Sequence, residues 1–598
     1  MCNILKNYLE MSSNKTEKSF DFTGLKRVIA LGLSQSKGLF LTVIFIAVFS
    51  ACFSVYRPYL TGDVIDNYIL NKDLLGLKSE IIKLIVILVF EGVLAFFTVY
   101  LANVVAQRVI RELRVRLYNH LIKFKLGYFD KTPNGVLVTR SVSDVETIAE
   151  VFNDGILVLL GDALKIIFIV AMMYYMNWVL ATIVIVILPL MMIITRYFQK
   201  ALKDVYQDER TLVAKLNTFV QERLTGMNII QVFNRQQAEY DKFVSINNDL
   251  KKNYLKTVLY FSLLFPVVDI VSALATGSLI WFGGLRTAVA GDVTVGNLIA
   301  FTQFITMLTT PMRAIAERFN SIQRGLVGAD RVFNILDADE TLPDKGTKKL
   351  EKVKGIIEFE NVVFSYVPNN PVLKGINLTT KPGETIAIVG STGAGKSTII
   401  NLLSRFYDID SGSIKIDGID IYDMDLVNLR KHVAVVLQDV FLFNTTIFDN
   451  IVLGNDKITL DEVKSAAKVI GIHDFIESLP KGYYSEVSER GSTLSVGQRQ
   501  LISFLRAYIY NPEILVLDEA TSSIDTNSEE MIQRATEKLT EGRTSIIIAH
   551  RLATIQKADQ IIVMDNGMIV EKGTHESLLA QKGYYSNLYE VQFSKINN

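Results

Sequence analysis

The residues that most clearly predict chemistry form a short loop of glycines and small polar side chains that ends in lysine and serine. Its members are Gly390, Ser391, Thr392, Gly393, Ala394, Gly395, Lys396 and Ser397. Glycines let successive backbone N–H groups turn toward phosphates, while Lys396 reaches the β- and γ-phosphates and the Ser397 hydroxyl ligates Mg²⁺. An apolar strand precedes this loop, and a helix beginning at Thr398 follows it. A glycine-rich turn that held lysine by chance would lack this order, so the loop predicts binding of a nucleoside triphosphate.

Three other apolar strands are each followed directly by polar side chains. Gln438 follows one strand, Asp518 and Glu519 end a second, and His550 follows a third. In a parallel sheet the carboxyl ends of the strands meet at the edge where a ligand binds. There Asp518 would hold Mg²⁺ through water, and Glu519 would polarise the attacking water. A single histidine is more often structural, but this shared edge favours a functional role.

A further polar turn precedes a predicted helix at residues 494–498. Ser495 is suited to cap that helix, whose free N–H groups would attract an anion. By itself this pattern is typical of any helix start.

The composition indicates more than one domain and a membrane location for part of the chain. A chain of 598 residues is too long for one core. Hydrophobic residues make up 49% and the mean hydropathy is +0.29, which favours membrane segments. Lys and Arg (62) balance Asp and Glu (62), so the net charge gives no reason to expect a nucleic-acid partner. Cys2 and Cys52 predict no disulfide framework, and no signal-peptide pattern is expected.

Six apolar runs have about the 20 residues that a membrane-spanning helix needs. They cover residues 38–56, 81–106, 155–176, 178–198, 257–284 and 295–313. The long connections after the second and fourth runs are rich in Lys and Arg, so these connections and both termini are predicted to be cytoplasmic. Helical spacing continues into both connections, with breaks expected around Thr132–Gly135 and around Asp204–Arg210, where a short transverse helix could sit.

Four ionisable residues fall inside these runs: Glu91, Asp162, Lys165 and Asp269. Charge at membrane depth is costly, so these side chains should face water or one another. Asp162 and Lys165 are three residues apart and could pair on one helix face. A substrate or proton pathway and a merely solvated vestibule both remain open.

The order of these features predicts the fold class: an α-helical transmembrane domain of six spans with long cytoplasmic extensions, followed by an α/β P-loop NTPase domain. The expected parts are a leader with an interfacial helix (1–37), the transmembrane domain (38–336), a linker (337–355) and the nucleotide-binding domain (356–598).

The motifs, taken in this order, resemble the nucleotide-binding domain of an ABC transporter. The resemblance implies that Tyr366 stacks on adenine, residues 390–397 are Walker A and Gln438 is the Q-loop, a ligand of nucleotide and Mg²⁺. Residues 494–498 resemble the signature, in which Ser495, Gly497 and Gln498 meet ATP. Asp518 and Glu519 resemble Walker B with its catalytic base, residues 522–525 the D-loop, and His550 the switch. Residues 128–146 and 221–233 resemble the intracellular loops of multidrug and lipid exporters.

One residue departs from the family pattern. The usual signature reads LSGGQ, whereas Val496 stands here in place of the first glycine. In the family two such domains dimerise head to tail, and each ATP lies between one Walker A and the other chain's signature. A β-branched side chain there would alter the approach to the partner-bound γ-phosphate. The resemblance somewhat favours a heterodimer with a second half-transporter and leaves a homodimer open.

The resemblance implies an exporter that hydrolyses ATP with Mg²⁺, using Glu519 and His550. As a dimer it would move a hydrophobic or amphipathic drug or lipid through the cytoplasmic membrane by alternating access. Two alternatives belong to other classes. A soluble ABC protein acting on DNA or ribosomes is disfavoured by the six apolar runs, and an ATP-gated regulatory or channel-like protein that does not pump remains open.

Overall fold

The structure is a computed structural model that describes residues 23–151, 157–289, 293–342, 346–518, 526–549 and 551–592. It divides into two compact units. The first consists of Met1–Ile122 and Asn134–Asp339, and the second of Lys123–Pro133 and Glu340–Asn598. The chain therefore enters the second unit twice, first through an eleven-residue excursion from the helical part.

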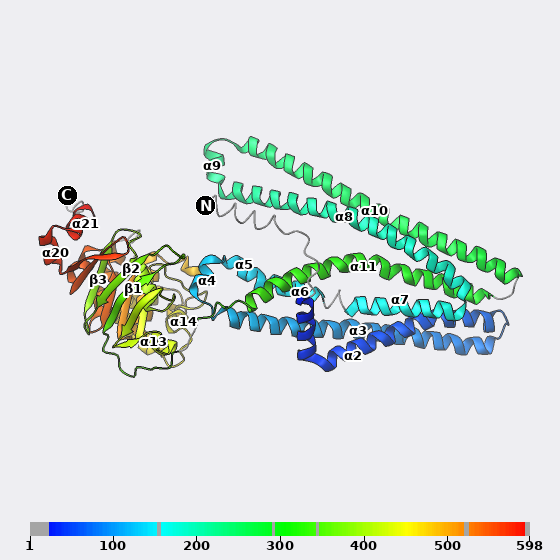
Figure 1. Cartoon of the computed structure of the whole chain (residues 1–598), viewed down its shortest axis with the longest axis horizontal. Helices are drawn as coiled ribbons and strands as arrows, with labels where there is room; N and C mark the ends of the chain where they lie inside the picture. Colours follow the sequence, from blue (N-terminus) through cyan, green and yellow to red (C-terminus); the bar gives the residue numbers. More distant parts are fainter. Residues whose placement is uncertain are drawn as a thin grey trace. The chain divides into compact units, whose positions relative to one another are not determined.

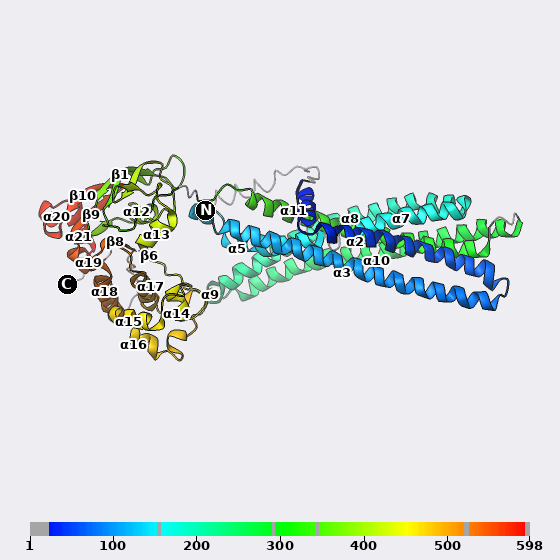
Figure 2. The same ribbon diagram turned by 90° about the horizontal axis from the view of Figure 1, so that it is seen from below.

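Long helices build the first unit and run lengthwise along it (Figures 1 and 2). They are α2 (Thr23–Val64), α3 (Leu74–Leu121), α7 (Leu157–Met176), α8 (Trp178–Thr225), α10 (Gln236–Val289) and α11 (Val295–Leu336). Shorter elements are η1 (Ile65–Ile69), α5 (Asn134–Thr139), η2 (Arg140–Asp144), α6 (Val145–Glu150) and α9 (Met227–Val232). A buried cluster that includes Val55, Ile169, Leu180 and Phe304 joins α2, α7, α8 and α11.

Five helices in the described part of the chain are long and apolar enough to cross a membrane. The sixth predicted run coincides with the start of α11, where the shorter apolar helix Val295–Thr309 lies. α10 has 54 residues and would measure roughly 80 Å at 1.5 Å per residue, against a hydrocarbon layer of about 30 Å. The helices therefore extend well beyond a bilayer, as the periodicity of the connections predicts.

The two predicted helix breaks have different outcomes. Near Thr132–Gly135 the helix is interrupted, and two short helices flank Pro133: α4 (Leu126–Lys131) and α5. The break expected at Asp204–Arg210 is wrong, because α8 runs through those residues without interruption. That segment contains no Gly or Pro, so its backbone hydrogen bonds continue. The chain turns instead at Gly226, which caps the C-terminus of α8 with its N–H bonded to Glu222 O.

The turn that joins α8, α9 and α10 is held by Glu239 at the start of α10. Its carboxylate accepts a hydrogen bond of 2.9 Å from Arg223 Nε and faces Lys242 Nζ at 3.4 Å and Arg235 Nε at 3.7 Å. Arg223 also stacks over the Phe219 ring at 4.3 Å. The Arg223 hydrogen bond holds the pKa of Glu239 below its usual value, with Lys242 adding to the effect.

The second unit contains a six-stranded sheet in the order β10-β9-β3-β8-β7-β6. Its strands are β3 (Thr385–Gly390), β6 (Val433–Val436), β7 (Ile514–Asp518), β8 (Thr544–Ile548), β9 (Gln560–Asp565) and β10 (Met568–Gly573). All neighbours are parallel except β10, which pairs antiparallel with β9. A smaller antiparallel sheet has the order β2-β1-β4-β5, built from β1 (Ile357–Phe364), β2 (Leu373–Thr379), β4 (Ser411–Ile416) and β5 (Ile419–Asp420).

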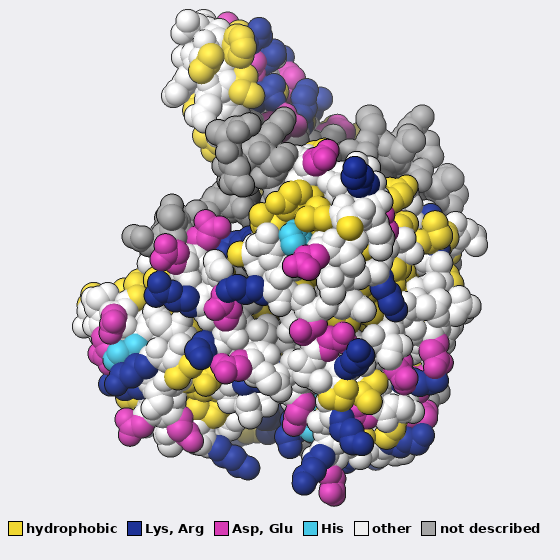
Figure 3. Space-filling view, turned by 90° about the vertical axis from the view of Figure 1, so that its left-hand side faces the viewer, with side chains coloured by type: hydrophobic (Ala, Val, Ile, Leu, Met, Phe, Trp, Pro, Cys, Tyr) yellow, Lys and Arg dark blue, Asp and Glu magenta, His cyan; other side chains and the backbone are white. Residues whose placement is uncertain are grey.

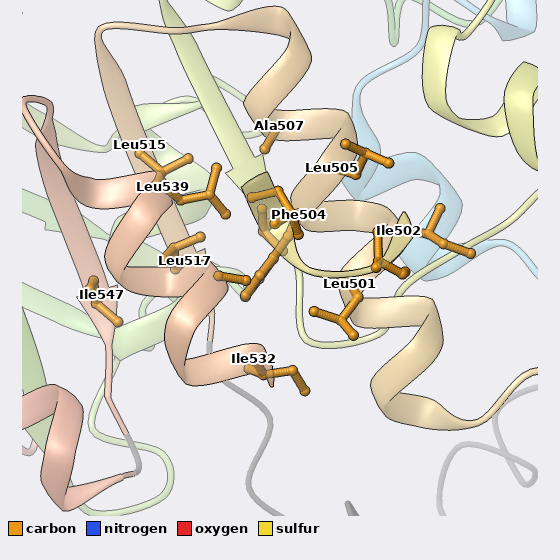
Figure 4. Close-up of a cluster of buried hydrophobic side chains, with 14 of the residues drawn as sticks. Leu501, Ile502, Phe504, Leu505, Ala507, Leu515, Leu517, Ile532, Leu539 and Ile547 are labelled. Carbon is orange, nitrogen blue, oxygen red and sulfur yellow. The ribbon is translucent and has the colours of Figure 1, made fainter. Parts of the chain in front are cut away.

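Helices and the small sheet cover the two faces of the parallel sheet. The helices are α12 (Lys396–Leu403), α13 (Leu426–His432), α14 (Ile447–Val452), α15 (Leu460–Ile470), α16 (His473–Ser478), α17 (Val496–Tyr510), α18 (Thr526–Thr540), α19 (Leu552–Lys557), α20 (His575–Gln581) and α21 (Tyr584–Gln592). Alternate residues of β7 enter different cores, so Leu515 and Leu517 pack with α17 and α18, whereas Val516 packs with the small sheet and α12. Figure 4 shows the first of these cores. The fold therefore confirms a helical membrane unit followed by an α/β unit.

The surface of the second unit carries charges of both signs. On the face shown in Figure 3, Lys and Arg side chains lie interspersed with Asp and Glu. Such mixing favours solubility of a domain that lies outside the bilayer.

The core of the second unit yields a stability prediction. Phe504 of α17 is 3% exposed and packs against β7 and α18, whereas Phe441 is 53% exposed. We expect Phe504→Ala to lower the free energy of unfolding of this unit by about 3–5 kcal/mol, because it leaves a cavity in a packed core. Thermal unfolding of the full chain in detergent measures the effect. Phe441→Ala is the control and should leave the midpoint unchanged.

The lowered pKa of Glu239 predicts a pH-dependent turn. Ionised Glu239 stabilises the α8–α10 turn at pH values above the usual carboxyl pKa of about 4.3, and this stabilisation is lost as the pH falls through the lower folded-state pKa. Glu239→Gln should therefore speed hydrogen exchange of residues 224–236 at pH 7. The difference from the wild type should fade in acid, and a difference that persists at all pH values would contradict this role.

Candidate functional site

The phosphate loop connects β3 to α12, as its sequence predicts. Gly390, Gly393 and Gly395 have φ values of 153°, 87° and 98°. A Cβ on Gly390 would lie 2.2 Å from the Met564 carbonyl oxygen of β9, and one on Gly395 would lie 2.7 Å from the Leu373 side chain. Larger residues at these two positions would therefore force the loop away from the neighbouring strands. The glycines keep the backbone close to the sheet edge and turned inward.

Lys396 lies at the centre of this loop. Its Nζ donates hydrogen bonds to the carbonyl oxygens of Gly390 at 2.8 Å and Ser391 at 3.0 Å. The residue is 7% exposed, and burial lowers the pKa of the ammonium while the nearby charge of Asp518 acts to raise it. A buried ammonium of this kind gains from additional negative charge.

Asp518 ends β7 beside the loop and is also buried. The Ser397 hydroxyl donates a hydrogen bond to its carboxylate. Burial raises the pKa of the Asp518 carboxyl, while the Ser397 hydrogen bond and the Lys396 charge act in the opposite direction. A hydroxyl and a carboxylate in contact are the oxygen ligands that Mg²⁺ prefers. A divalent cation would also relieve the burial of this carboxylate, so Ser397 and Asp518 fit the metal.

Parallel pairing aligns the ends of the strands that precede the other predicted positions. Asp518 at the end of β7 pairs with Ile548 at the end of β8. Glu519, His550 and residues 522–525 lie outside the described residues, although the strands before Glu519 and His550 are neighbours. Gln438 is exposed in the segment after β6, the other neighbour of β7. Asp439 beside it acts on the Asp518 carboxyl and was not singled out from the sequence, where no spacing signal marks it.

Tyr366 lies beside the first turn of α12. Its hydroxyl donates to Thr398 Oγ1 at 3.4 Å and accepts a hydrogen bond from Asn401 Nδ2 at 3.1 Å. Its ring contacts Phe364 and Tyr407 edge to face, with centroids 4.8 and 5.1 Å apart. The aromatic ring is therefore anchored close to the helix that follows the phosphate loop.

The predicted signature forms the start of α17. Ser495 Oγ accepts a hydrogen bond from Gln498 N at 3.2 Å, and Gln498 Oε1 accepts one from Ser495 N at 2.9 Å. This reciprocal capping box satisfies two backbone donors at the helix start. Val496 is the first residue of the helix and is half-buried, and Gly497 is buried. The cap predicted for Ser495 is confirmed, while contact of these residues with ATP stays a prediction.

The excursion Lys123–Pro133 contacts the rest of the second unit at Tyr407 and Asp408, close to Tyr366. The Tyr407 hydroxyl donates to Asp130, and Lys125 Nζ lies 2.8 Å from Asp408 Oδ2. Burial raises the pKa of Tyr407 and the Asp130 hydrogen bond raises it further, so the hydroxyl stays a donor. A β-bridge between Phe124 and Thr341 joins the excursion to the segment in which the chain enters the second unit again. The sequence predicts a break with a short transverse helix here but does not identify Tyr407 or Asp408.

Comparison with known proteins agrees with this arrangement. Residues 40–312 match the family described as ABC transporter transmembrane region, and residues 373–522 match the family described as ABC transporter. The chain is 36% identical over 584 residues to the uncharacterized ABC transporter ATP-binding protein YfiC of Bacillus subtilis (strain 168), covering 98% of this chain and 96% of that protein.

Two further relatives carry names that state a cargo. One is the ATP-dependent lipid A-core flippase of Syntrophus aciditrophicus (strain SB), 37% identical over 538 residues, with 90% of this chain and 89% of that protein covered. The other is the fatty acid ABC transporter ATP-binding/permease protein of Mycobacterium tuberculosis (strain CDC 1551 / Oshkosh), 37% identical over 485 residues, with 81% and 76% covered.

Membrane region and ATP-binding domain thus occur in one chain that matches its relatives over most of their length. The chain is a multi-pass membrane protein whose ATP-binding domain couples ATP hydrolysis to transport. It belongs to the ABC transporter family, as an exporter-type half-transporter.

Proposed function

We propose that this chain is one half of a dimeric ABC exporter that moves a hydrophobic or amphipathic drug or lipid across the bacterial cytoplasmic membrane. The observation that carries the proposal is one chain holding both long apolar helices and a phosphate loop in which buried Lys396 and exposed Ser397 lie beside the buried Asp518 of β7. Relatives named for lipid A-core, fatty acid and multidrug transport support this cargo class. The basic connections support a cytoplasmic location for both termini.

The residues of this chain divide the work at ATP. Lys396 exchanges its two loop carbonyls for β- and γ-phosphate oxygens, which its ammonium binds more strongly because they are charged. Ser397 and Asp518 hold Mg²⁺, with Gln438 as a further ligand, and bound Mg²⁺ supplies neutralisation of phosphate charge. Backbone N–H groups of residues 390–398 bind the phosphates, and Tyr366 stacks on adenine. Glu519 polarises the attacking water, and His550 contacts the γ-phosphate side of the site.

A second chain completes each site. Ser495, Gly497 and Gln498 lie at a helix N-terminus, which favours the phosphates of ATP bound to the other half. The α9 turn offers an apolar contact for that half, because Ile229, Val232 and Phe233 are 63%, 75% and 69% exposed. Val496 adds a branched side chain to the signature, which favours pairing with a different half-transporter whose signature completes the site on this chain.

The excursion Lys123–Pro133 connects hydrolysis to the membrane helices. Its ion pair and hydrogen bond to Asp408 and Tyr407 seat it on the nucleotide-binding unit, and α3 and α5 continue from its two ends. Movement of the nucleotide-binding unit therefore carries these helices with it. In this way ATP-driven closure of the two nucleotide-binding units of the dimer opens the transmembrane cavity to the outside.

Nucleotide chemistry can be tested by paired substitutions. Lys396→Ala should abolish ATP binding, whereas Glu519→Gln should bind ATP and lose turnover by about 100-fold or more, the usual contribution of a general base. Nucleotide binding and phosphate release by the purified chain measure both effects. Glu541→Gln, an exposed carboxylate on the same unit, is the control. Retained hydrolysis in Glu519→Gln would contradict its role as base.

Coupling between ATP hydrolysis and the membrane helices can be tested at the contact between the excursion and Tyr407. Tyr407→Phe keeps the ring contacts with Phe364 and Tyr366 but removes the hydroxyl that bonds Asp130. We expect it to reduce substrate stimulation of the ATPase with little change in basal ATPase, and Asp130→Asn should match it. The double variant should be no worse than either single one, since both remove the same interaction. Strictly additive losses would contradict a shared contact.

Transport itself is tested in inverted membrane vesicles. ATP should drive accumulation of an amphiphile above its outside concentration, and Glu519→Gln should prevent it. Equilibration that ATP speeds without accumulation would show a gated path and contradict the exporter proposal.

A further inference from the structure

Three charged side chains of the helical unit act on one another, far from the phosphate loop in the sequence. Arg57 Nε of α2 lies 3.3 Å from Glu91 Oε2 of α3, and Lys165 of α7 interacts electrostatically with both groups. Asp162, one helical turn before Lys165, also has an interaction partner. Among these three, two cations share one carboxylate, and charge at membrane depth is costly unless it is compensated.

The Arg57–Glu91 pair is an incomplete interaction. Arg57 Nε and Glu91 Oε2 are both shielded from solvent, and neither has a hydrogen-bond partner within the described residues. The Arg57 side chain is nevertheless 36% exposed, because its other face borders a cavity. A guanidinium presents five N–H donors in a planar fork that matches a carboxylate or a phosphate. Arg57 is therefore suited to receive a second anion.

The cavity is lined by both polar and apolar side chains. It measures about 460 Å³ and lies between α2, α3 and α11, within the size range of small-molecule sites. Arg57 and Gln303 supply polar groups, whereas Ile81, Ile85 and Leu88 line the side formed by α3. A neutral apolar molecule would offer the Arg57 guanidinium no acceptor in addition to Glu91, and a cationic one would be repelled by Arg57 and Lys165. An acidic head group attached to a hydrocarbon chain matches both the guanidinium of Arg57 and the apolar side chains of α3.

We propose that this cavity binds an acidic amphiphile, with its carboxylate or phosphate head group on Arg57 and its chain along Ile81, Ile85 and Leu88. Glu91 competes with the head group for the guanidinium, and Lys165 adds attraction. That this amphiphile is the exported substrate rests on the proposed function, whereas the binding itself does not.

The test uses the full-length protein in phosphatidylcholine nanodiscs without nucleotide. A photoactivatable oleate is crosslinked to the protein, and mass spectrometry maps its attachment to residues 81–88 of α3. Unlabelled competitors then give apparent affinities. Oleate and oleoyl lysophosphatidate should compete and thereby rank carboxylate against phosphate head groups, whereas oleyl alcohol, oleylamine and inorganic phosphate should not. Equal competition by oleyl alcohol, or by inorganic phosphate, would overturn the proposal.

Substitutions of opposite expected sign separate a binding role from a structural one. Arg57→Gln should weaken oleate binding by about tenfold or more, the loss of a charged hydrogen bond. Arg57→Lys should keep the preference for acidic over neutral competitors. Glu91→Gln should strengthen binding, because it frees the guanidinium. Lys78→Gln, one turn before Ile81 and exposed, is the charge-matched control and should change nothing.

The outcomes are distinguishable from those of the transport tests. Binding that survives Arg57→Gln, or that falls equally in Arg57→Gln and Glu91→Gln, would show that the ion pair is only structural. If Arg57→Gln does not fold, the effect of Glu91→Gln and the head-group preference of the wild type still distinguish a binding role from a structural one. Because no nucleotide is present, a negative result leaves the ATPase and transport proposals untouched.

Discussion

The nucleotide site depends on the parallel pairing of β3, β8, β7 and β6. Their hydrogen bonds align the carboxyl ends of the strands, so that Asp518 is placed opposite Ile548 and next to the phosphate loop. The sheet can hold this alignment because both of its faces are buried, by α17 and α18 on one side and by α12 with the small sheet on the other. A shift of one residue in the pairing would move every side chain of a strand to the opposite face and so into the other core.

Buried charge occurs in both units, with a different arrangement in each. At the phosphate loop, Lys396 and Asp518 each lie in surroundings that disfavour their ionised forms, which is a poor arrangement for stability and a good one for receiving phosphate and a cation. In the helical unit, Arg57 and Glu91 pair without a hydrogen bond. At both sites charged groups can still gain favourable interactions, and a ligand of suitable charge can supply them.

The excursion Lys123–Pro133 explains how two units of different composition can act together. The helices of the first unit are stabilised by apolar packing, and the second unit has its own cores. The excursion belongs to the helical chain in sequence and to the nucleotide-binding unit in space. Its polar contacts, Lys125 to Asp408 and Asp130 to Tyr407, join side chains more than 270 positions apart in sequence.

The sequence alone determined the class of both units and the phosphate loop, because these depend on local patterns. Hydrophobic runs specify spanning helices, and the glycines with Lys396 and Ser397 specify a loop whose geometry is set by its own residues. The capping box at Ser495 is equally local. The continuous helix through Asp204–Arg210 was missed, since polar residues there suggest a break that backbone hydrogen bonding does not require. Only the tertiary structure brought Tyr407 to Asp130 and Arg57 to Glu91, because long-range packing rather than spacing decides which distant side chains meet.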